Sequence, residues 1–447
     1  MRILIIAPSA YILGGVQNCL DYLLPGLQSL GSEVILGLPD GDIHRGAEYL
    51  SAHPWSCVEL ITNPTGSAQG RVNAIVEKIL KVKPDVVVSV NMGDCLEAVA
   101  TLRVSGQLDT RLVHTIHAIE ADYMSDLEHY QNVVDGVIYT NRLVKPLIET
   151  RVDIETSRLF YAPYGVEVLD NIERPKANMQ SILWMGRLEQ SQKRCLELPL
   201  IAMALDSMMP SWELALAGDG PEADQLRGEF AKTAQDRVRW LGCIPHKQLL
   251  EEVLPKTDVL LVNSTWETGP ITIWEAMAAG VPVVTSRYTG SGVEQSLVNE
   301  HNVLMFDIGD VHAAAKCISL LFSDAGLRNR LVSHGHELVK QKYSIPHSVE
   351  SWHRALLAVM DLPPRESIEH SFIEHSANGR LDRWLGLNLG EKVRGVLRKS
   401  WKHHTAGSEW PHARYGASVA ERENFMELAR AFDRQGRQKN YLDPSSL

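Results

Sequence analysis

The strongest constraint on how this chain folds is a repeated alternation of short apolar runs with helix-length segments. In the first half, apolar or β-branched runs occur at 2–7, 33–38, 85–90, 111–116 and 136–140. Helical patterns, for example over 16–30 and 68–80, separate them. Continuous apolar runs of this kind are typical of strands buried on both faces of a parallel sheet. Repeated strand–helix units predict a doubly wound α/β domain.

The same alternation restarts after a polar stretch near 170–180. Apolar runs follow at 181–185, 212–217, 238–241, 258–263, 281–285 and 303–306, with helical patterns at 221–233, 271–279 and 311–322. Two Rossmann-like domains normally face each other across a cleft at the carboxyl ends of their strands. We expect an N-terminal domain over 1–168 and a second domain over 169–345. A closing helix with linker should follow over 346–362, and a mainly helical C-terminal extension over 363–447.

The composition excludes several classes of protein. With 45% hydrophobic and 22% charged residues, the chain has the composition of a globular protein rather than a disordered one. Its net charge of −11 argues against a nucleic-acid binder, which would carry a basic excess. The N-terminal apolar run is short and leads into Gly14-Gly15, which favours a first strand over a signal peptide. Since no stretch approaches the roughly 18 apolar residues that span a bilayer, we expect a cytoplasmic protein that at most lies on the inner face of the membrane.

Six cysteines, at 19, 57, 95, 195, 243 and 317, lie far apart and form no Cys-x-x-Cys pair. This spacing argues against a zinc knuckle and a dense disulfide framework. It predicts buried free thiols in a reducing compartment.

Candidate ligands for an anion follow the first strand of each expected domain. Arg187 and Lys193 come after the run 181–185, and two cations at the carboxyl edge of a parallel sheet can hold a diphosphate. Gly14 and Gly15 precede the first helix, where glycines let backbone N–H groups approach an anion. The alternatives, a solvated loop for the cations and a plain turn for the glycines, stay open on these residues alone.

A strand–turn–helix segment carries two carboxylates. The run 258–263 leads into a turn with Glu267, and the following helix carries Glu275. Carboxylates accept paired hydrogen bonds from the hydroxyls of sugars and riboses. The N–H groups from Gly269 to Thr272 lie at the positive end of this helix, a position suited to a phosphate.

A second turn, after the run 212–217, has a structural explanation. Gly218 and Gly220 make the turn sharp, and Pro221 is expected to be the first residue of a helix. We expect Asp219 to cap that helix rather than to act in catalysis.

Taken in this order, the motifs resemble the GT-B glycosyltransferases, specifically the large retaining family four. The resemblance covers roughly residues 1–360 and is strongest over 181–310. The residues that carry it are Gly14-Gly15-Val16, Ala162-Pro163-Tyr164-Gly165-Val166, Met185-Gly186-Arg187-Leu188 with Lys193, Gly218-Asp219-Gly220-Pro221, Glu267 to Glu275, and Ala276-Met277-Ala278-Ala279-Gly280-Val281-Pro282-Val283-Val284.

The resemblance implies a role for each candidate in the second domain. Arg187 and Lys193 are expected to neutralise the donor diphosphate. Glu275 is expected to bind the ribose and Glu267 the hydroxyls of the donor sugar. The turn is expected to bring N–H groups to the phosphate, with the residues Gly269, Pro270, Ile271 and Thr272. Many relatives have Gly-Phe-Gly where this chain has Thr268-Gly269-Pro270, which leaves the donor's identity open.

In the first domain the resemblance singles out His117, which matches a histidine that reaches the transferred sugar. Gly15, next to Gly14, is expected to approach the diphosphate from this side. The alternative for a lone loop histidine is a structural role.

The implied reaction moves a sugar from a nucleotide diphosphosugar, UDP- or GDP-linked, to a glycan or a lipid-linked acceptor. Cations and helix N-termini stabilise the charge that develops on the leaving diphosphate. No Asp-x-Asp metal motif follows a predicted strand, so we expect no cofactor and no metal. Two alternatives stay open: a sugar-nucleotide epimerase or hydrolase with this fold, and a non-catalytic subunit.

Residues 361–447 lie outside the resemblance and differ in charge, with 14 Lys and Arg against 12 Asp and Glu. A helical stripe of Val393, Val396, Leu397 and Trp401 is surrounded by Lys392, Arg394, Arg398, Lys399 and Lys402. A basic amphipathic helix with a tryptophan predicts a peripheral membrane contact through 391–404. The alternative is a helix that packs its stripe on the acidic body. A second helix is expected over 419–432.

Overall fold

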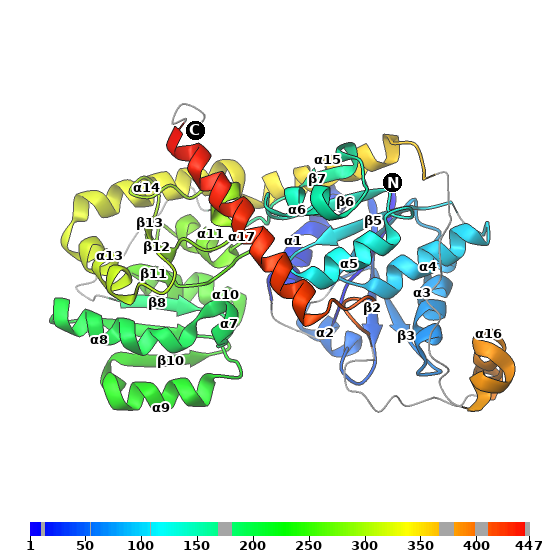
Figure 1. Cartoon of the computed structure of the whole chain (residues 1–447), viewed down its shortest axis with the longest axis horizontal. Helices are drawn as coiled ribbons and strands as arrows, with labels where there is room; N and C mark the ends of the chain where they lie inside the picture. The colour runs from blue at the N-terminus through cyan, green and yellow to red at the C-terminus, as the bar shows by residue number, and fades with distance from the viewer. Residues whose placement is uncertain are drawn as a thin grey trace. The chain divides into compact units, whose positions relative to one another are not determined.

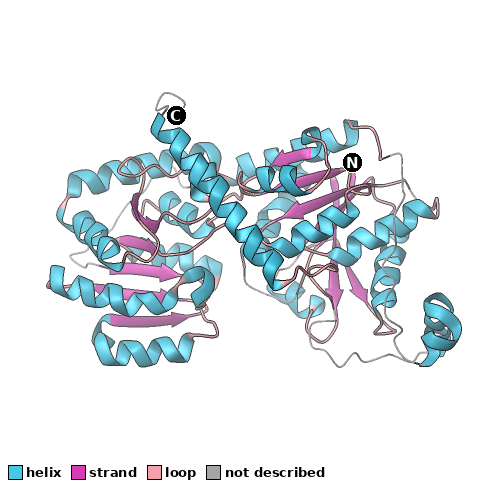
Figure 2. Ribbon diagram, in the orientation of Figure 1, coloured by secondary structure: helices cyan, strands magenta, loops and turns pink. Residues whose placement is uncertain are grey.

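The computed structural model describes residues 1–9, 14–53, 55–107, 109–168, 181–365, 380–397 and 410–442. Its contacts divide the chain into two compact units. Unit 1 comprises Met1–Thr140, Val144–Ala162 and Val349–Met426. Unit 2 comprises Asn141–Leu143, Pro163–Ser348 and the chain from Glu427 onward. Each unit contains its own parallel sheet, drawn in magenta in Figure 2.

Unit 1 is built on seven parallel strands in the order β3-β2-β1-β4-β5-β6-β7. They are β1 (Arg2–Ile6), β2 (Glu33–Asp40), β3 (Val58–Thr62), β4 (Val86–Val90), β5 (Arg111–Ile116), β6 (Gly136–Tyr139) and β7 (Leu159–Tyr161). The five predicted strands are confirmed, with small shifts at their ends. The sequence patterns missed β3 and β7, which are the two edge strands of this sheet and are only partly buried.

Helices flank the sheet of unit 1 (Figure 1). They are α1 (Gly15–Ser29), α2 (Gly46–Ala52), α3 (Ala68–Val82), α4 (Gly93–Val104), α5 (Ala121–Tyr130) and α6 (Val144–Arg151). Ser67 begins α3 as its N-cap, since its side chain accepts a hydrogen bond from the Gly70 N–H.

Unit 2 is built on six parallel strands in the order β10-β9-β8-β11-β12-β13. They are β8 (Ser181–Met185), β9 (Glu213–Ala217), β10 (Val238–Gly242), β11 (Val259–Val262), β12 (Val283–Ser286) and β13 (Leu304–Phe306). All six were predicted, and the two-sheet α/β architecture is confirmed. The strand expected from residue 281 begins at Val283, because the preceding Pro282 has no N–H for the ladder.

The helices of unit 2 are α7 (Gln190–Lys193), α8 (Leu198–Met208), α9 (Ala223–Thr233), α10 (His246–Gln248), α11 (Ile271–Ala278), α12 (Ser291–Glu294), α13 (Val311–Ser323) and α14 (Ala325–Lys342). Short 3-10 turns occur at Thr156–Arg158, Cys195–Glu197, Gln235–Arg237 and Leu254–Lys256, and a π-helical turn at Leu249–Val253.

The packing of strand β8 explains why its sequence is apolar after Ser181. Ile182 and Trp184 belong to one hydrophobic cluster, whereas Leu183 and Met185 belong to another. Alternate side chains of a strand point to opposite faces. Both faces of the sheet are therefore covered, which accounts for the continuous apolar run over 182–185.

Two expectations about the turn before α9 are wrong. This helix begins at Ala223 with Glu222 as its N-cap, so Pro221 is not its first residue and Asp219 does not cap it. Asp219 instead accepts a hydrogen bond from the Gly220 N–H, at 2.9 Å. The turn packs closely against the loop after β8, since a Cβ on Gly220 would lie 2.3 Å from the Leu188 carbonyl oxygen.

The C-terminal helices are α15 (Ile345–Asp361), α16 (Arg380–Leu397) and α17 (Val419–Leu442). Helix α17 starts where it was expected but is longer than 419–432. Helix α16 starts before the expected basic helix and bends at Gly386, while residues 398–404 lie outside the described part of the chain. The predicted boundary at residue 363 stays a prediction. Among the described helices, none is both long and apolar enough to cross a bilayer.

All six cysteines are free. Cys19, Cys95 and Cys195 are buried as expected, but Cys57 and Cys243 are exposed, so the expectation of buried thiols is wrong for these two. Both exposed cysteines stand next to edge strands, Cys57 before β3 and Cys243 after β10, where one side of the strand has no neighbour.

Candidate functional site

The strand orders place the predicted site at a topological switch point. In unit 2 the central β8 has β9 on one side and β11 on the other. Ligands of open α/β sheets bind beyond the carboxyl ends of strands at such a point. Lys193 follows β8 and Glu267 follows β11, so the topology brings the two segments to the same edge of the sheet.

Lys193 and Glu267 form an ion pair at this edge. The Lys193 Nζ lies 2.6 Å from Glu267 Oε1, and both side chains are largely buried. The Ser264 hydroxyl donates to the same carboxylate oxygen, also at 2.6 Å. The Glu267 N–H donates to the carbonyl of Thr289, which holds the backbone of the turn. A buried carboxylate with two donors on one oxygen keeps acceptor capacity on the other for a sugar hydroxyl.

The one-turn helix α7 positions Lys193. The Glu189 carboxylate caps this helix, accepting hydrogen bonds from the N–H groups of Ser191 and Gln192. The side chain of Gln192 donates to the carbonyl of Trp266 at 3.1 Å, which connects the loop after β8 to the turn that carries Glu267. Arg187 lies in the same loop with its side chain exposed.

The loop that carries Arg187 crosses closely over the turn that follows β9. Gly218 has a φ of +136°, and a Cβ at this position would lie 1.9 Å from the Gly186 carbonyl oxygen. Two backbone hydrogen bonds join the crossing segments, from Leu188 to Asp219 and from Gly186 to Ala217. Only glycine allows this approach. The turn at Gly218, for which we expected only a structural role, therefore also determines where the loop with Arg187 begins.

Glu275 has a partner that the sequence analysis missed. It is buried on α11, and its Oε1 lies 2.6 Å from His246 Nε2. His246 begins α10, just after the carboxyl end of β10. His246 could have been predicted from its position, because it is a polar residue that follows a strand end, and the same reasoning singled out Lys193 and Glu267.

The turn before α11 only partly matches its predicted role. Gly269 adopts a φ of +129°, and Pro270 is the N-cap residue. The Ile271 N–H donates to the Gly269 carbonyl at 2.8 Å, so it is satisfied within the turn rather than open to an anion. Thr272 lies in the first turn of the helix, and its contact with a phosphate stays a prediction.

The first-domain candidates lie in unit 1. Gly15 is the first residue of α1, and Gly14 precedes it in an extended conformation. His117 follows β5 and is buried, with its ring stacked on Trp352 at a centroid distance of 6.2 Å. Burial, together with the nearby His114, lowers the pKa of His117 to about 3, so the ring is neutral. Its predicted contact with a donor sugar stays a prediction.

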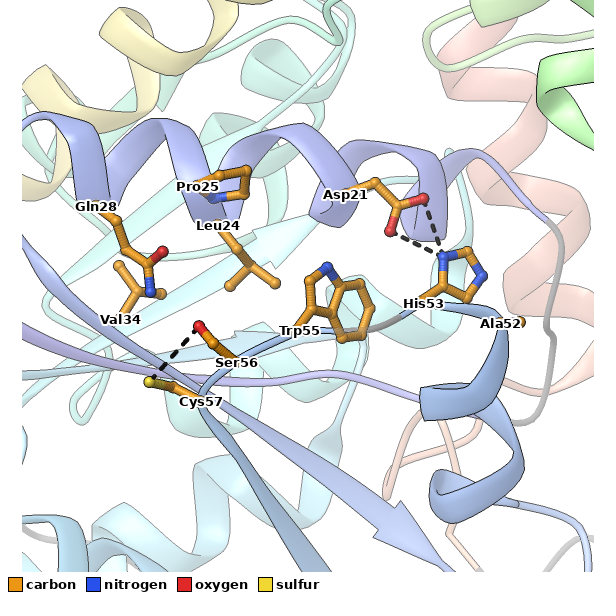
Figure 3. A pocket seen from close by; sticks show the side chains of 10 residues that line it. All are labelled: Asp21, Leu24, Pro25, Gln28, Val34, Ala52, His53, Trp55, Ser56 and Cys57. Carbon is orange, nitrogen blue, oxygen red and sulfur yellow. Dashed lines mark hydrogen bonds and ion pairs between the residues drawn. The ribbon is translucent and has the colours of Figure 1, made fainter.

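Unit 1 also contains a cavity of about 390 Å³ that none of the predicted site residues lines. It lies between α1 and the segment that precedes β3, as Figure 3 shows. His53 Nδ1 lies 2.8 Å from Asp21 Oδ1 at its rim, and the Trp55 ring forms part of its wall.

Comparison with known proteins agrees with these features. Residues 168–338 match the family of glycosyl transferases group 1. A lipopolysaccharide core biosynthesis glycosyltransferase, LpsE of Rhizobium meliloti, is 34% identical over 141 residues, which cover 30% of this chain and 39% of LpsE. A Campylobacter jejuni N-acetylgalactosaminyltransferase, whose name specifies a PP-undecaprenol-linked glycan, is 27% identical over 40% of this chain and 48% of its own length.

Solved structures share the fold over a larger part of the chain. HepE of Anabaena, in complex with UDP and glucose, superposes with a TM-score of 0.66 at 18% identity, covering 80% of this chain and 99% of HepE. The galactosyltransferase WaaB superposes with a TM-score of 0.63 at 17% identity, with the same coverage of each chain. The resemblance to group 1 glycosyltransferases and the GT-B fold are thus confirmed, although the sequence matches to LpsE and to the Campylobacter enzyme each span less than half of the relative.

Proposed function

We propose that this chain is a retaining glycosyltransferase that moves a sugar from a nucleotide diphosphosugar, UDP- or GDP-linked, to an acceptor hydroxyl. The observation that carries the proposal is the Lys193–Glu267 pair at the switch point of unit 2, within the segment that matches the family. This pair can serve two parts of a donor, because the ammonium can bind the diphosphate while the carboxylate accepts hydrogen bonds from the hydroxyls of the sugar.

The chemistry follows from the charges at this edge of the sheet. An ammonium has three N–H donors, so Lys193 can keep its bond to Glu267 and still donate to phosphate oxygens. Arg187, exposed on the same loop, can bind the diphosphate through its forked donors. Together they stabilise the negative charge that develops as the diphosphate leaves. Glu275, oriented by His246, accepts hydrogen bonds from the two ribose hydroxyls.

We further propose that the acceptor hydroxyl attacks on the face from which the diphosphate departs, and that the leaving phosphate takes its proton. Glu267 then needs no covalent role, which agrees with its bonds to Lys193 and Ser264 on one oxygen. The cations Arg187 and Lys193 supply the charge that a metal would otherwise provide, so we propose that transfer needs no divalent metal.

The acceptor is proposed to be a glycan or a lipid-linked glycan of cell-surface polysaccharide or glycolipid synthesis, at the inner face of the membrane. Support comes from the relatives, which are named for lipopolysaccharide core synthesis and for a PP-undecaprenol-linked glycan.

The test uses the purified full chain with a panel of UDP-, GDP- and ADP-sugars and lipid-linked or soluble glycan acceptors. We expect transfer with retention at the anomeric carbon, detected by mass spectrometry and NMR, and undiminished by a metal chelator. Arg187→Ala and Glu275→Ala should each reduce transfer, by about 100-fold for the arginine. Unchanged transfer in both variants would refute the site.

The same assay separates the alternatives. A hydrolase or epimerase would consume the donor equally well without an acceptor, whereas a non-catalytic subunit would bind nucleotide and turn over no donor. Loss of transfer on chelation, restored by a divalent cation, would refute metal independence alone.

A further inference from the structure

Helix α16 attaches to unit 1 through its charged side chains. Asp382, Glu391 and Arg394 are all buried. The Arg394 guanidinium contacts both carboxylates, and its Nη1 lies 2.9 Å from Glu391 Oε2. Glu391 also accepts a hydrogen bond from the hydroxyl of Ser67, at 2.6 Å, and another from Thr65. Since Ser67 caps α3, these contacts bind α16 to the start of a helix of unit 1.

Helix α16 exposes five large apolar side chains. We call this set the outer face of α16, and it consists of Trp384, Leu385, Leu389, Val396 and Leu397. Trp384 is 85% exposed and Val396 83% exposed. An ordinary surface helix buries its apolar stripe and exposes its charges, so the usual arrangement is reversed here. Of the stripe predicted from the sequence, Val396 and Leu397 are exposed and Val393 is partly buried, while Trp401 lies outside the described residues.

The exposed charges of α16 all have one sign. Its two acidic residues, Asp382 and Glu391, are buried, whereas Arg380, Arg383 and Lys392 are exposed. The sequence continues with Arg398, Lys399 and Lys402, which lie outside the described residues. A purely basic surface on a chain with a net charge of −11 favours an anionic partner at this place.

We infer that the outer face of α16 inserts into the surface of an anionic membrane. An apolar face with a tryptophan, bordered by Lys and Arg, enters the boundary between headgroups and acyl chains, and its binding depends on anionic lipid. A second copy that docked through the same face would present the same positive charges and would repel, so the charge pattern favours lipid over a symmetric dimer at this place. The helix bends at Gly386, where φ is +73°, and exposed apolar residues lie on both sides of the bend in the sequence.

This inference rests on the proposed function in one respect: the purpose of membrane binding is to hold the enzyme at a lipid-linked acceptor. The binding itself requires no catalysis. It also differs from the contact predicted from the sequence through 391–404, because three of the five apolar residues, Trp384, Leu385 and Leu389, precede that segment.

The experiment measures sedimentation of the full-length protein with vesicles of phosphatidylcholine alone or mixed with phosphatidylglycerol. We expect binding only to the anionic vesicles, weakened by high salt. The double variant Trp384→Ser/Val396→Ser should bind at least about tenfold more weakly. The matched control is Leu200→Ser/Met203→Ser on α8, where the exposed fractions are 52% and 53%. This control should bind like the wild type.

Equal binding of the wild type and the α16 variant would overturn the inference, and so would equal binding to neutral and anionic vesicles. A wild-type protein that is a dimer in sedimentation velocity, with the α16 variant a monomer, would overturn it as well. Both α16 substitutions remove exposed apolar groups, so thermal unfolding should be unchanged and confirms folding. Transfer to a soluble acceptor without vesicles, measured in parallel, separates the two proposals. Activity without vesicle binding would refute this inference alone. Vesicle binding without activity would refute the proposed function alone.

Discussion

Lys193 and Glu267, which are separated by 73 residues in the chain and were assigned to different parts of the donor, are directly bonded, with 2.6 Å between Nζ and Oε1. The residue proposed to bind the diphosphate and the residue proposed to bind the sugar therefore form one ion pair. Loss of either partner leaves the other buried with an uncompensated charge. Their contributions to catalysis should therefore be coupled.

The first prediction concerns this coupling. We expect Lys193→Ala to lower kcat/KM by about 10²- to 10³-fold. Glu267→Gln should also lower it, and the double variant should lose much less than the product of the two single losses. Steady-state kinetics of the four proteins measures the coupling. The exposed Lys247→Ala is the control, and strictly multiplicative losses would show that the two residues act independently.

The second prediction concerns His246, which orients Glu275 across 2.6 Å. His246→Ala removes a hydrogen bond to a charged group and should raise the donor KM by about 10- to 100-fold. The value of kcat should change little, because the ribose lies away from the reacting bond. His246→Gln, which retains a donor, should recover part of the affinity. A fall in kcat at unchanged KM would contradict this positioning role.

The third prediction tests the loop crossing under Arg187. Gly218→Ala places a Cβ 1.9 Å from the Gly186 carbonyl oxygen in a conformation with φ of +136°. We expect a loss of about 3 kcal/mol or more in the free energy of unfolding. The control is Gly228→Ala on α9, where a Cβ meets nothing within 4 Å. This control should stabilise by about 0.5–1 kcal/mol, and equal denaturation midpoints for the two variants would refute the crossing.

The fourth prediction concerns the segment before α17, which is bound to unit 1 by buried charges. The Arg414 side chain is 2% exposed and contacts Asp94, which also pairs with Arg71 at 2.6 Å. The N–H groups of Arg414 and Tyr415 donate to Asp126.

Arg414→Ala should cost about 3 kcal/mol in the free energy of unfolding, because it breaks a buried ion pair. Arg422→Ala, whose ion pair with Asp122 is half exposed, should cost less than about 1 kcal/mol. Urea denaturation of both variants measures the difference, and equal losses would show that burial of Arg414 contributes nothing.

The fifth prediction concerns acid stability. Burial lowers the pKa of His114 to about 4, and neither of its ring nitrogens has a hydrogen-bond partner within the described chain. An unfolded histidine binds a proton near pH 6.5. Between these two pH values the unfolded state binds one more proton, so this histidine makes the protein less stable as the pH falls from about 6.5 to about 4.

His114→Leu should reduce the slope of unfolding free energy against pH in this window by up to about 1.4 kcal/mol per pH unit. Above pH 7 the slopes of variant and wild type should coincide. Thermal unfolding across this pH range checks both statements. A slope unchanged by the substitution would mean that His114 takes up its proton in the folded protein.

Local patterns in the sequence were sufficient for the central strands and for the family. Strands such as β4 and β8 are buried on both faces, so all of their residues except Ser89 and Ser181 are apolar and the run is conspicuous. The edge strands β3 and β7 were not predicted, since β3 mixes polar and apolar residues and β7 has only three residues. Lys193, Glu267 and Glu275 could be proposed from the sequence because each follows a strand end or lies on the helix beyond it.

Only the tertiary structure decided which of these residues touch. The Lys193–Glu267 bond, the His246 partner of Glu275 and the burial of His117 all depend on strand order, which brings distant segments together and leaves no trace in local spacing. The same holds for α16. Its sequence shows an apolar stripe among basic residues, but the outward direction of that stripe results from the Glu391 bonds to Thr65 and Ser67, more than 300 residues earlier in the chain.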